Sequence, residues 1–188
     1  MKDNSPDEFK WEKLFREEEK SVRDYLDLLP KYIYLPGEDM LMSGQKAETE
    51  SFDSEDNDEE EDFELSWKKH KDSIIVEKLL KLSKSWLLIQ NAVLSNKEKP
   101  IGLRISALLA MSTGRLLTVI SSSNENPEFC VANYKRLRKE FCTCENNMRA
   151  LIKLSPQISG LIEEKIHVVM ELIAFASDKI FEFRKKIS

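Results

Sequence analysis

Apolar residues recur every three or four positions from about residue 72 to residue 183, and this spacing constrains the fold more than any other feature. A period near 3.6 is that of an α-helix with one buried face. It predicts four helices: about 72–94, about 100–121, one that opens at Pro127, and one that opens at Ser155 and ends at residues 184–186. The second is apolar on most faces, which predicts that it is the central and most buried helix.

A further helix is predicted near the N-terminus, where Trp11 and Phe15 begin another apolar face and Pro30 ends it. No alternating pattern long enough for a sheet is present, and five glycines in 188 residues disfavour turn-rich folds. The chain is therefore predicted to be an all-α bundle of about five helices. We expect Asp72 or Ser73, and Ser155, to cap two of the helices. No run of about 18 uninterrupted apolar residues predicts a membrane span, and no signal peptide is visible.

An acidic run separates the first helix from the others. It holds eleven carboxylates from Glu48 to Glu64 and no Lys or Arg, and the net charge of −5 becomes +6 when they are set aside. Such a run repels itself and buries little apolar surface. The chain is therefore divided into a helix and extended strap over 1–39, a disordered acidic linker over 40–64, and a helical bundle over 65–188. The linker is either a solvated spacer or an electrostatic arm for a basic partner.

The residues that carry catalysis or bind metals are few. Of the two histidines, His167 lies in the last helix, where a structural role is expected, and His70 lies in a basic patch. Cys142 and Cys144 are two positions apart on a helix and point to different faces, so they cannot share one zinc ion. No nucleophile or phosphate-loop motif is found. We expect no enzyme activity, no metal site and no cofactor.

Protein binding is the function that remains. Only two dense basic patches occur, over 68–71 and 135–139, and neither interleaves aromatic residues as single-stranded nucleic-acid sites do. The apolar segment from Tyr32 to Leu35 is suited to docking on a partner. We expect no direct nucleic-acid binding and no membrane association.

The order of several landmarks resembles that of the Gemin two family, the partner of the survival-of-motor-neuron (SMN) protein. The similar features are a tryptophan helix with a Val-Arg pair, a proline and an acidic run that closes on Trp-Lys-Lys, a helix with a late tryptophan, an Ala-Leu-Leu-Ala core helix preceded by an arginine, a basic helix with cysteine, and an aromatic-acid-x-Arg ending. The positions that carry them are Trp11, Val22, Arg23, Pro36, Trp67, Trp86, Arg104, 107–110, 138–144, Phe181 and Arg184.

This resemblance implies a non-catalytic adaptor of the SMN complex, which binds SMN and Sm proteins during assembly of spliceosomal small nuclear ribonucleoprotein cores, in cytoplasm and nucleus. It implies partner contacts at Trp11, Val22, Arg23, Tyr32, Tyr34, Trp67, Trp86, Arg104, Phe181 and Arg184. The family's long N-terminal arm and its Phe-Cys-Leu-Gly sequence have no counterpart here, so the Sm D-one/D-two pair is the expected Sm partner. The alternative is a helical-bundle scaffold subunit of another intracellular complex.

Overall fold

The computed structural model describes residues 7–17, 20, 24, 72–122 and 126–187. Its long helices are α4 (Ser73–Ala92), α5 (Lys99–Ser122), α6 (Pro127–Leu154) and α7 (Ser159–Ile187), and the short 3-10 helix η1 (Pro156–Ile158) precedes α7. Residues 8–17 form one more helix, and the described part of the chain contains no strand. The prediction of an all-α bundle of about five helices is confirmed. The proposed linker, 40–64, lies outside the described residues.

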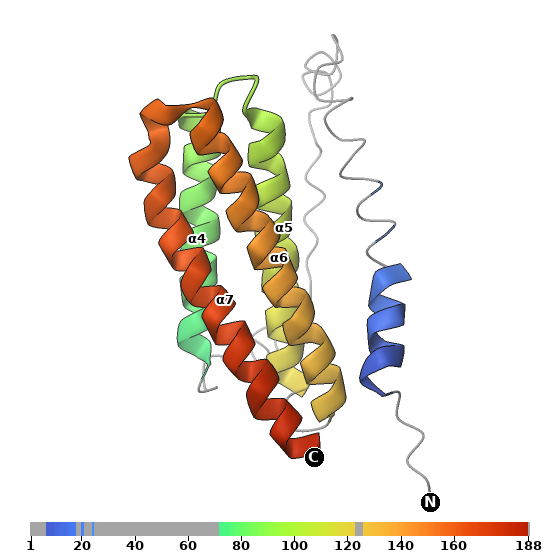
Figure 1. Ribbon diagram of the computed structural model, residues 1–188. Coiled ribbons are helices and arrows are strands. Elements are labelled where there is room, and N and C mark those ends of the chain that lie inside the picture. Colours follow the sequence, from blue (N-terminus) through green and yellow to red (C-terminus); the bar gives the residue numbers. More distant parts are fainter. Residues whose placement is uncertain (1–6, 18–19, 21–23, 25–71, 123–125, 188) are drawn as a thin grey trace, which may run out of the picture.

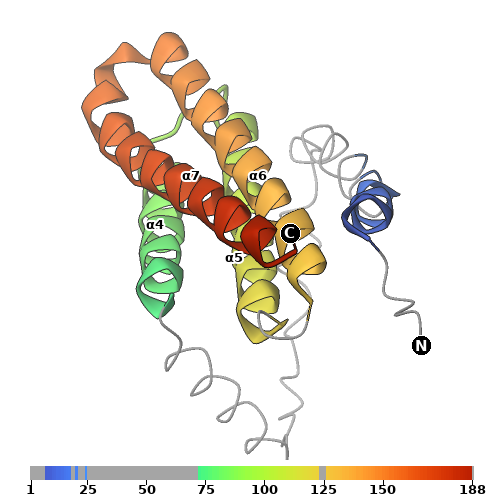
Figure 2. The same ribbon diagram turned by 60° about the horizontal axis from the view of Figure 1, so that its bottom comes forward.

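The four long helices form a closed bundle. Each packs against the next along the chain, and α7 returns to contact α4. Figures 1 and 2 show them side by side, with residues 8–17 outside the bundle on the side of α5 and α6. Short connections between helices favour antiparallel neighbours, as in other bundles of this kind. Buried apolar residues from all four helices fill the interior.

The central helix is α6, which corrects the expectation that the second predicted helix is central. Twelve residues of α6 are buried, whereas α5 has seven. The reason is that α6 packs against both α5 and α7, with residues 8–17 on a further side. Several of its buried residues are polar, including Asn133, Arg136 and Glu140, so counting apolar residues understates how much of α6 is covered.

Two of the predicted helix caps are absent for identifiable reasons. The carboxylate of Asp72 makes no cap hydrogen bond, because it pairs with the buried ammonium of Lys179 at 2.9 Å and so ties α4 to α7. Burial alone would lower the pKa of Lys179, but hydrogen bonds to Asp72 and Glu182 outweigh it and raise the pKa above its ordinary value. Ser155 ends α6, its side chain accepts no cap hydrogen bond, and Pro156 opens η1. By contrast, Asn126 caps α6 by accepting from the amide of Phe129 at 3.0 Å.

Helix α5 is long and apolar enough, by length and composition, to cross a membrane. The inference from the sequence that no segment could span a membrane is therefore too strong. In this structure α5 packs between α4 and α6, and 33% of its most apolar 18-residue window is buried. Core helices of globular proteins pass the same test of length and composition, so this feature is weak evidence for a membrane role.

Candidate functional site

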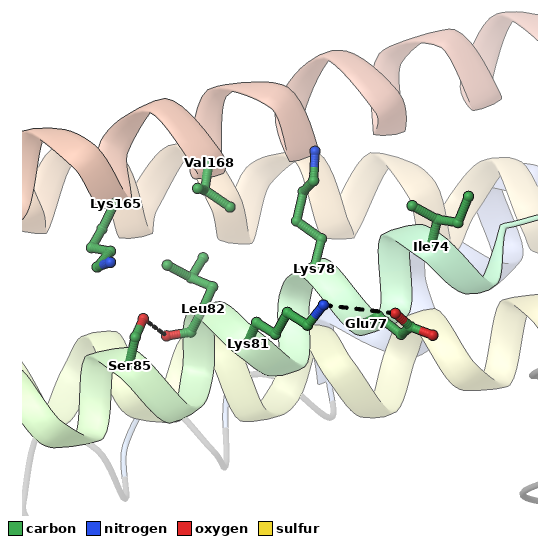
Figure 3. Close-up of a pocket in the computed structure, with 8 residues that line it drawn as sticks. All are labelled: Ile74, Glu77, Lys78, Lys81, Leu82, Ser85, Lys165 and Val168. Carbon is green, nitrogen blue, oxygen red and sulfur yellow. Dashed lines mark hydrogen bonds and ion pairs between the residues drawn. The ribbon is translucent and has the colours of Figure 1, made fainter.

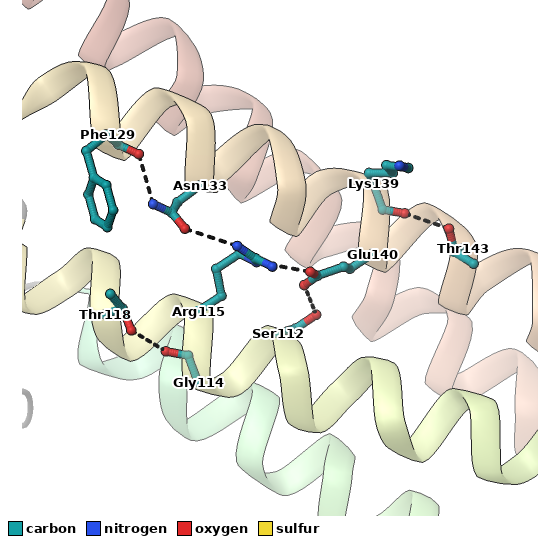
Figure 4. Close-up of polar contacts among 9 residues, drawn as sticks. All are labelled: Ser112, Gly114, Arg115, Thr118, Phe129, Asn133, Lys139, Glu140 and Thr143. Atoms are coloured by element: carbon teal, nitrogen blue, oxygen red, sulfur yellow. Dashed lines mark hydrogen bonds and ion pairs between the residues drawn. The ribbon is translucent and has the colours of Figure 1, made fainter. Parts of the chain in front are cut away.

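A buried polar layer joins α5 to α6 and is drawn in Figure 4. The carboxylate of Glu140 accepts hydrogen bonds from the Ser112 hydroxyl at 2.9 Å and from Nε of Arg115 at 3.0 Å. Nη1 of Arg115 also donates to Oδ1 of Asn133 at 3.2 Å. Because the Arg115 and Glu140 side chains are only 15% and 7% exposed, this ion pair is shielded from water. The layer fixes the position of Arg115 on the side of α5 that faces α6.

Residues 8–17 pack on α5 and α6 next to this layer, through aromatic contacts. The Trp11 ring meets Phe129 of α6 edge to face, with centroids 4.9 Å apart, and Phe15 meets the same ring at 6.0 Å. The guanidinium of Arg115 lies over the Phe15 ring, 5.4 Å from its centroid. Edge-to-face aromatic pairs and an arginine over a ring are favourable contacts in addition to the area they bury.

Charged groups also join residues 8–17 to the bundle. The Glu8 carboxylate pairs with Lys135 and also with Arg184, the latter at 3.4 Å. Nη2 of the buried Arg136 donates to the backbone carbonyl of Glu12 at 2.9 Å. We name this surface of the bundle the helix-docking face. It consists of Arg115, Phe129, Lys135, Arg136 and Arg184.

A second surface is a groove between α4 and α7, with a cavity of about 390 Å³. Figure 3 shows Leu82 and Val168 in it, with lysines from both helices around them. These lysines are already paired with acids: Lys78 with Glu171, Lys81 with Glu77 at 3.9 Å, and Lys165 with Glu164 at 3.3 Å. The groove is therefore better suited to an apolar side chain than to a bare anion.

The predicted partner-contact residues differ in their exposure and in their contacts. Phe181 is 63% exposed on α7, and Arg104 is exposed on α5. Trp11 and Arg184 both take part in the contact between residues 8–17 and the bundle. The remaining predicted positions lie outside the described residues: Val22, Arg23, Tyr32, Tyr34 and Trp67.

The prediction that Trp86 contacts a partner is corrected by the structure. Its side chain is fully buried, and its Nε1 donates to the carbonyl of Gly102 at 3.0 Å. A side chain with no exposed surface cannot contact a partner of the folded bundle. Gly102 has little space for a side chain of its own, because a Cβ there would lie 2.6 Å from Cδ1 of Leu94. Trp86 therefore links α4 to α5 in the core.

Sequence reasoning missed Phe129, Lys135 and Arg136 as part of one surface. In the sequence, Lys135 and Arg136 form only part of a basic patch, and Phe129 gives no signal of its own. The seven-residue spacing from Phe129 to Arg136, about two helical turns, could have indicated that these two residues share a side of α6.

No group of His, Cys, Asp and Glu within the described ranges has the arrangement of a metal site. His167 is exposed on α7, not packed in the core. Burial raises the pKa of Cys130 to about 11, although nearby Lys186 opposes the shift, and burial raises the pKa of Cys144 to about 12. Neither thiol is therefore prepared to act as a nucleophile near neutral pH.

We expect thiol labelling of the folded protein to distinguish the three cysteines. Cys142 is partly exposed, whereas Cys130 and Cys144 are buried and hold their protons. A disulfide reagent at pH 8 should modify Cys142 first and the other two only at the rate at which the bundle opens. Mass spectrometry of the labelled protein identifies the sites. Rapid modification of Cys144 in native protein would contradict the packing of α6.

Taken as surfaces, the helix-docking face and the α4–α7 groove are suited to binding protein segments. Comparison with known proteins finds no match, whether by family model, among curated proteins or among solved structures.

Proposed function

We propose that this chain is a non-catalytic adaptor that binds SMN and the Sm D-one/D-two pair during assembly of spliceosomal ribonucleoprotein cores, in cytoplasm and nucleus. The observation that carries the proposal is the order of the landmarks from Trp11 to Arg184, which resembles the Gemin two family over nearly the whole chain. An all-α bundle is what such an adaptor requires, because it presents rigid helix surfaces to several partners.

Two surface features support partner binding. The α4–α7 groove has an apolar floor at Leu82 and Val168, and Ile74 at its edge is 69% exposed. An amphipathic partner helix buries apolar side chains in grooves of this kind. Arg104 and Phe181 lie exposed, where an Sm subunit could reach them.

The acidic run from Glu48 to Glu64 supports binding to basic partners. Sm proteins bind RNA and are basic, and opposite charges accelerate association at low salt. Because exposed charges are screened beyond about 8 Å at physiological ionic strength, this contribution should depend on salt.

A generic helical scaffold for another complex is the second candidate. The observation that favours it is the burial of Trp86, since a family landmark read as a partner contact instead serves the core. Both candidates are protein-binding functions and differ in the partner.

The test is a titration of the purified Sm D-one/D-two pair into the chain at two salt concentrations. Arg104→Asp should weaken binding while the helical circular dichroism signal stays unchanged, because Arg104 is exposed and reversal of its charge leaves the core intact. Neutralising about half of the acidic run should slow association, and more so at low salt. Equal binding by wild type and both variants at both salts would contradict the electrostatic part of the proposal.

A further inference from the structure

Residues 8–17 pack on the surface of the bundle and are not part of its core. The apolar core is built from α4 to α7 and η1, and neither Trp11 nor Phe15 belongs to it. Both side chains are only partly buried, and they rest on Phe129, which itself packs against the core from outside. Removing this helix would therefore uncover the helix-docking face without opening the core.

The bundle recognises three chemical features of the docked helix. Lys135 and Arg184 bind the Glu8 carboxylate at one end. Phe129 meets both aromatic rings, and Arg115 lies over the second. In sequence these features read as an acid followed by an aromatic residue three positions later and a second aromatic four positions after that, which places all three on one side of a helix.

The outer side of the same helix has a different character. Phe9 is 77% exposed and Leu14 is 47% exposed, so neither is held by the bundle in this structure. The helix-docking face contacts the side of this helix that carries Glu8, Trp11 and Phe15. The contact is therefore selective for one side of an amphipathic helix and does not arise from general apolar collapse.

We propose that the helix-docking face is a binding site for an amphipathic helix of the pattern acid-x-x-aromatic-x-x-x-aromatic, which residues 8–17 occupy within the chain until a partner helix of the same pattern displaces them. The inference goes beyond the adaptor function and does not depend on which complex the chain joins. It also gives Trp11 two states, one docked on Phe129 and one released from it.

The covalent connection determines how strongly the helix competes. Residues 8–17 and the bundle belong to one chain, so docking is an intramolecular event and an added helix must compete with the effective concentration of the docked one. A partner helix binds only the fraction of molecules whose face is open, and its apparent affinity falls by that fraction. Weakening the docked helix should therefore strengthen binding of an added one.

The experiment uses the full chain and a fluorescein-labelled peptide with the sequence of residues 7–24. The variant Trp11→Ala with Phe15→Ala removes both rings that contact Phe129 and should bind the peptide at least about tenfold more tightly than wild type. Phe9→Ala removes an aromatic residue from the outer side of the same helix and should behave as wild type. Adding Lys135→Glu to the double variant should lower its affinity for the peptide severalfold, since Lys135 pairs with Glu8.

Circular dichroism and the urea midpoint establish that each variant is folded before binding is compared. The proposal is overturned if the folded double variant does not bind the peptide, or if the double variant and Phe9→Ala bind it equally. It is also overturned if light scattering shows a wild-type dimer that the double variant lacks, because the face would then receive the helix of a second copy.

Discussion

Replacing Trp86 with alanine should lower the free energy of unfolding by about 3–5 kcal/mol, the range for a large aromatic side chain removed from a packed core. Trp86 is fully buried between α4 and α5, and the change also leaves the Gly102 carbonyl without the Nε1 donor. Gly102 lies close to Leu94, so α5 has little freedom to move in and fill the cavity. Urea denaturation followed by circular dichroism measures the loss.

Leu88→Ala is the matched control for this prediction. Leu88 lies on the same helix and is 71% exposed, so its truncation should change the free energy of unfolding by no more than about 0.5 kcal/mol. Trp86→Phe tests the hydrogen bond separately, because it keeps an aromatic ring in the core. Similar small effects for Trp86→Ala and Leu88→Ala would mean that Trp86 is not in the core and would restore it as a candidate contact.

Glu140→Ala should be comparably damaging, at about 3–5 kcal/mol, because it breaks a buried ion pair from one side. The change removes the carboxylate that accepts from both Ser112 and Arg115, while the Arg115 charge stays in a site that is only 15% exposed. Replacing both charged residues, as Arg115→Met with Glu140→Leu, should recover part of the loss, since an apolar pair needs no charge partner.

A second glutamate on α6 provides the control. Glu145 pairs with Arg149 at 2.7 Å, one helical turn along, and Arg149 is 53% exposed. Exposed pairs of this spacing contribute about 0.3–0.5 kcal/mol. If Glu145→Ala and Glu140→Ala destabilise the protein equally, the polar layer between α5 and α6 is not the buried pair described here.

The helices themselves could be predicted from the sequence because apolar spacing is a local signal. Pro127 does open α6, and the basic residues 184–186 do lie in the last turn of α7. The identity of the central helix could not be predicted, because it depends on how many neighbours a helix has. Asn133, Arg136 and Glu140 look like surface residues in sequence, and they are buried because their partners come from α5 and residues 8–17.

The candidate site was less accessible to sequence reasoning than the fold. Trp11 was recognised as a landmark, but the residue it packs on, Phe129, lies far along the chain, and no local pattern links them. Trp86 resembled a family contact, yet the same indole is an equally good core residue, and only its position between α4 and α5 decides between the two. Contacts between distant segments are what the three-dimensional structure adds.

Reconstitution from purified components tests the proposed adaptor function most directly. The chain, SMN and the Sm D-one/D-two pair are mixed and passed over a size-exclusion column with light-scattering detection. The proposal predicts one complex that contains all of them, with a mass equal to the sum of its parts. If the chain is folded by circular dichroism and elutes alone, apart from both SMN and the Sm pair, the assignment to spliceosomal core assembly is wrong.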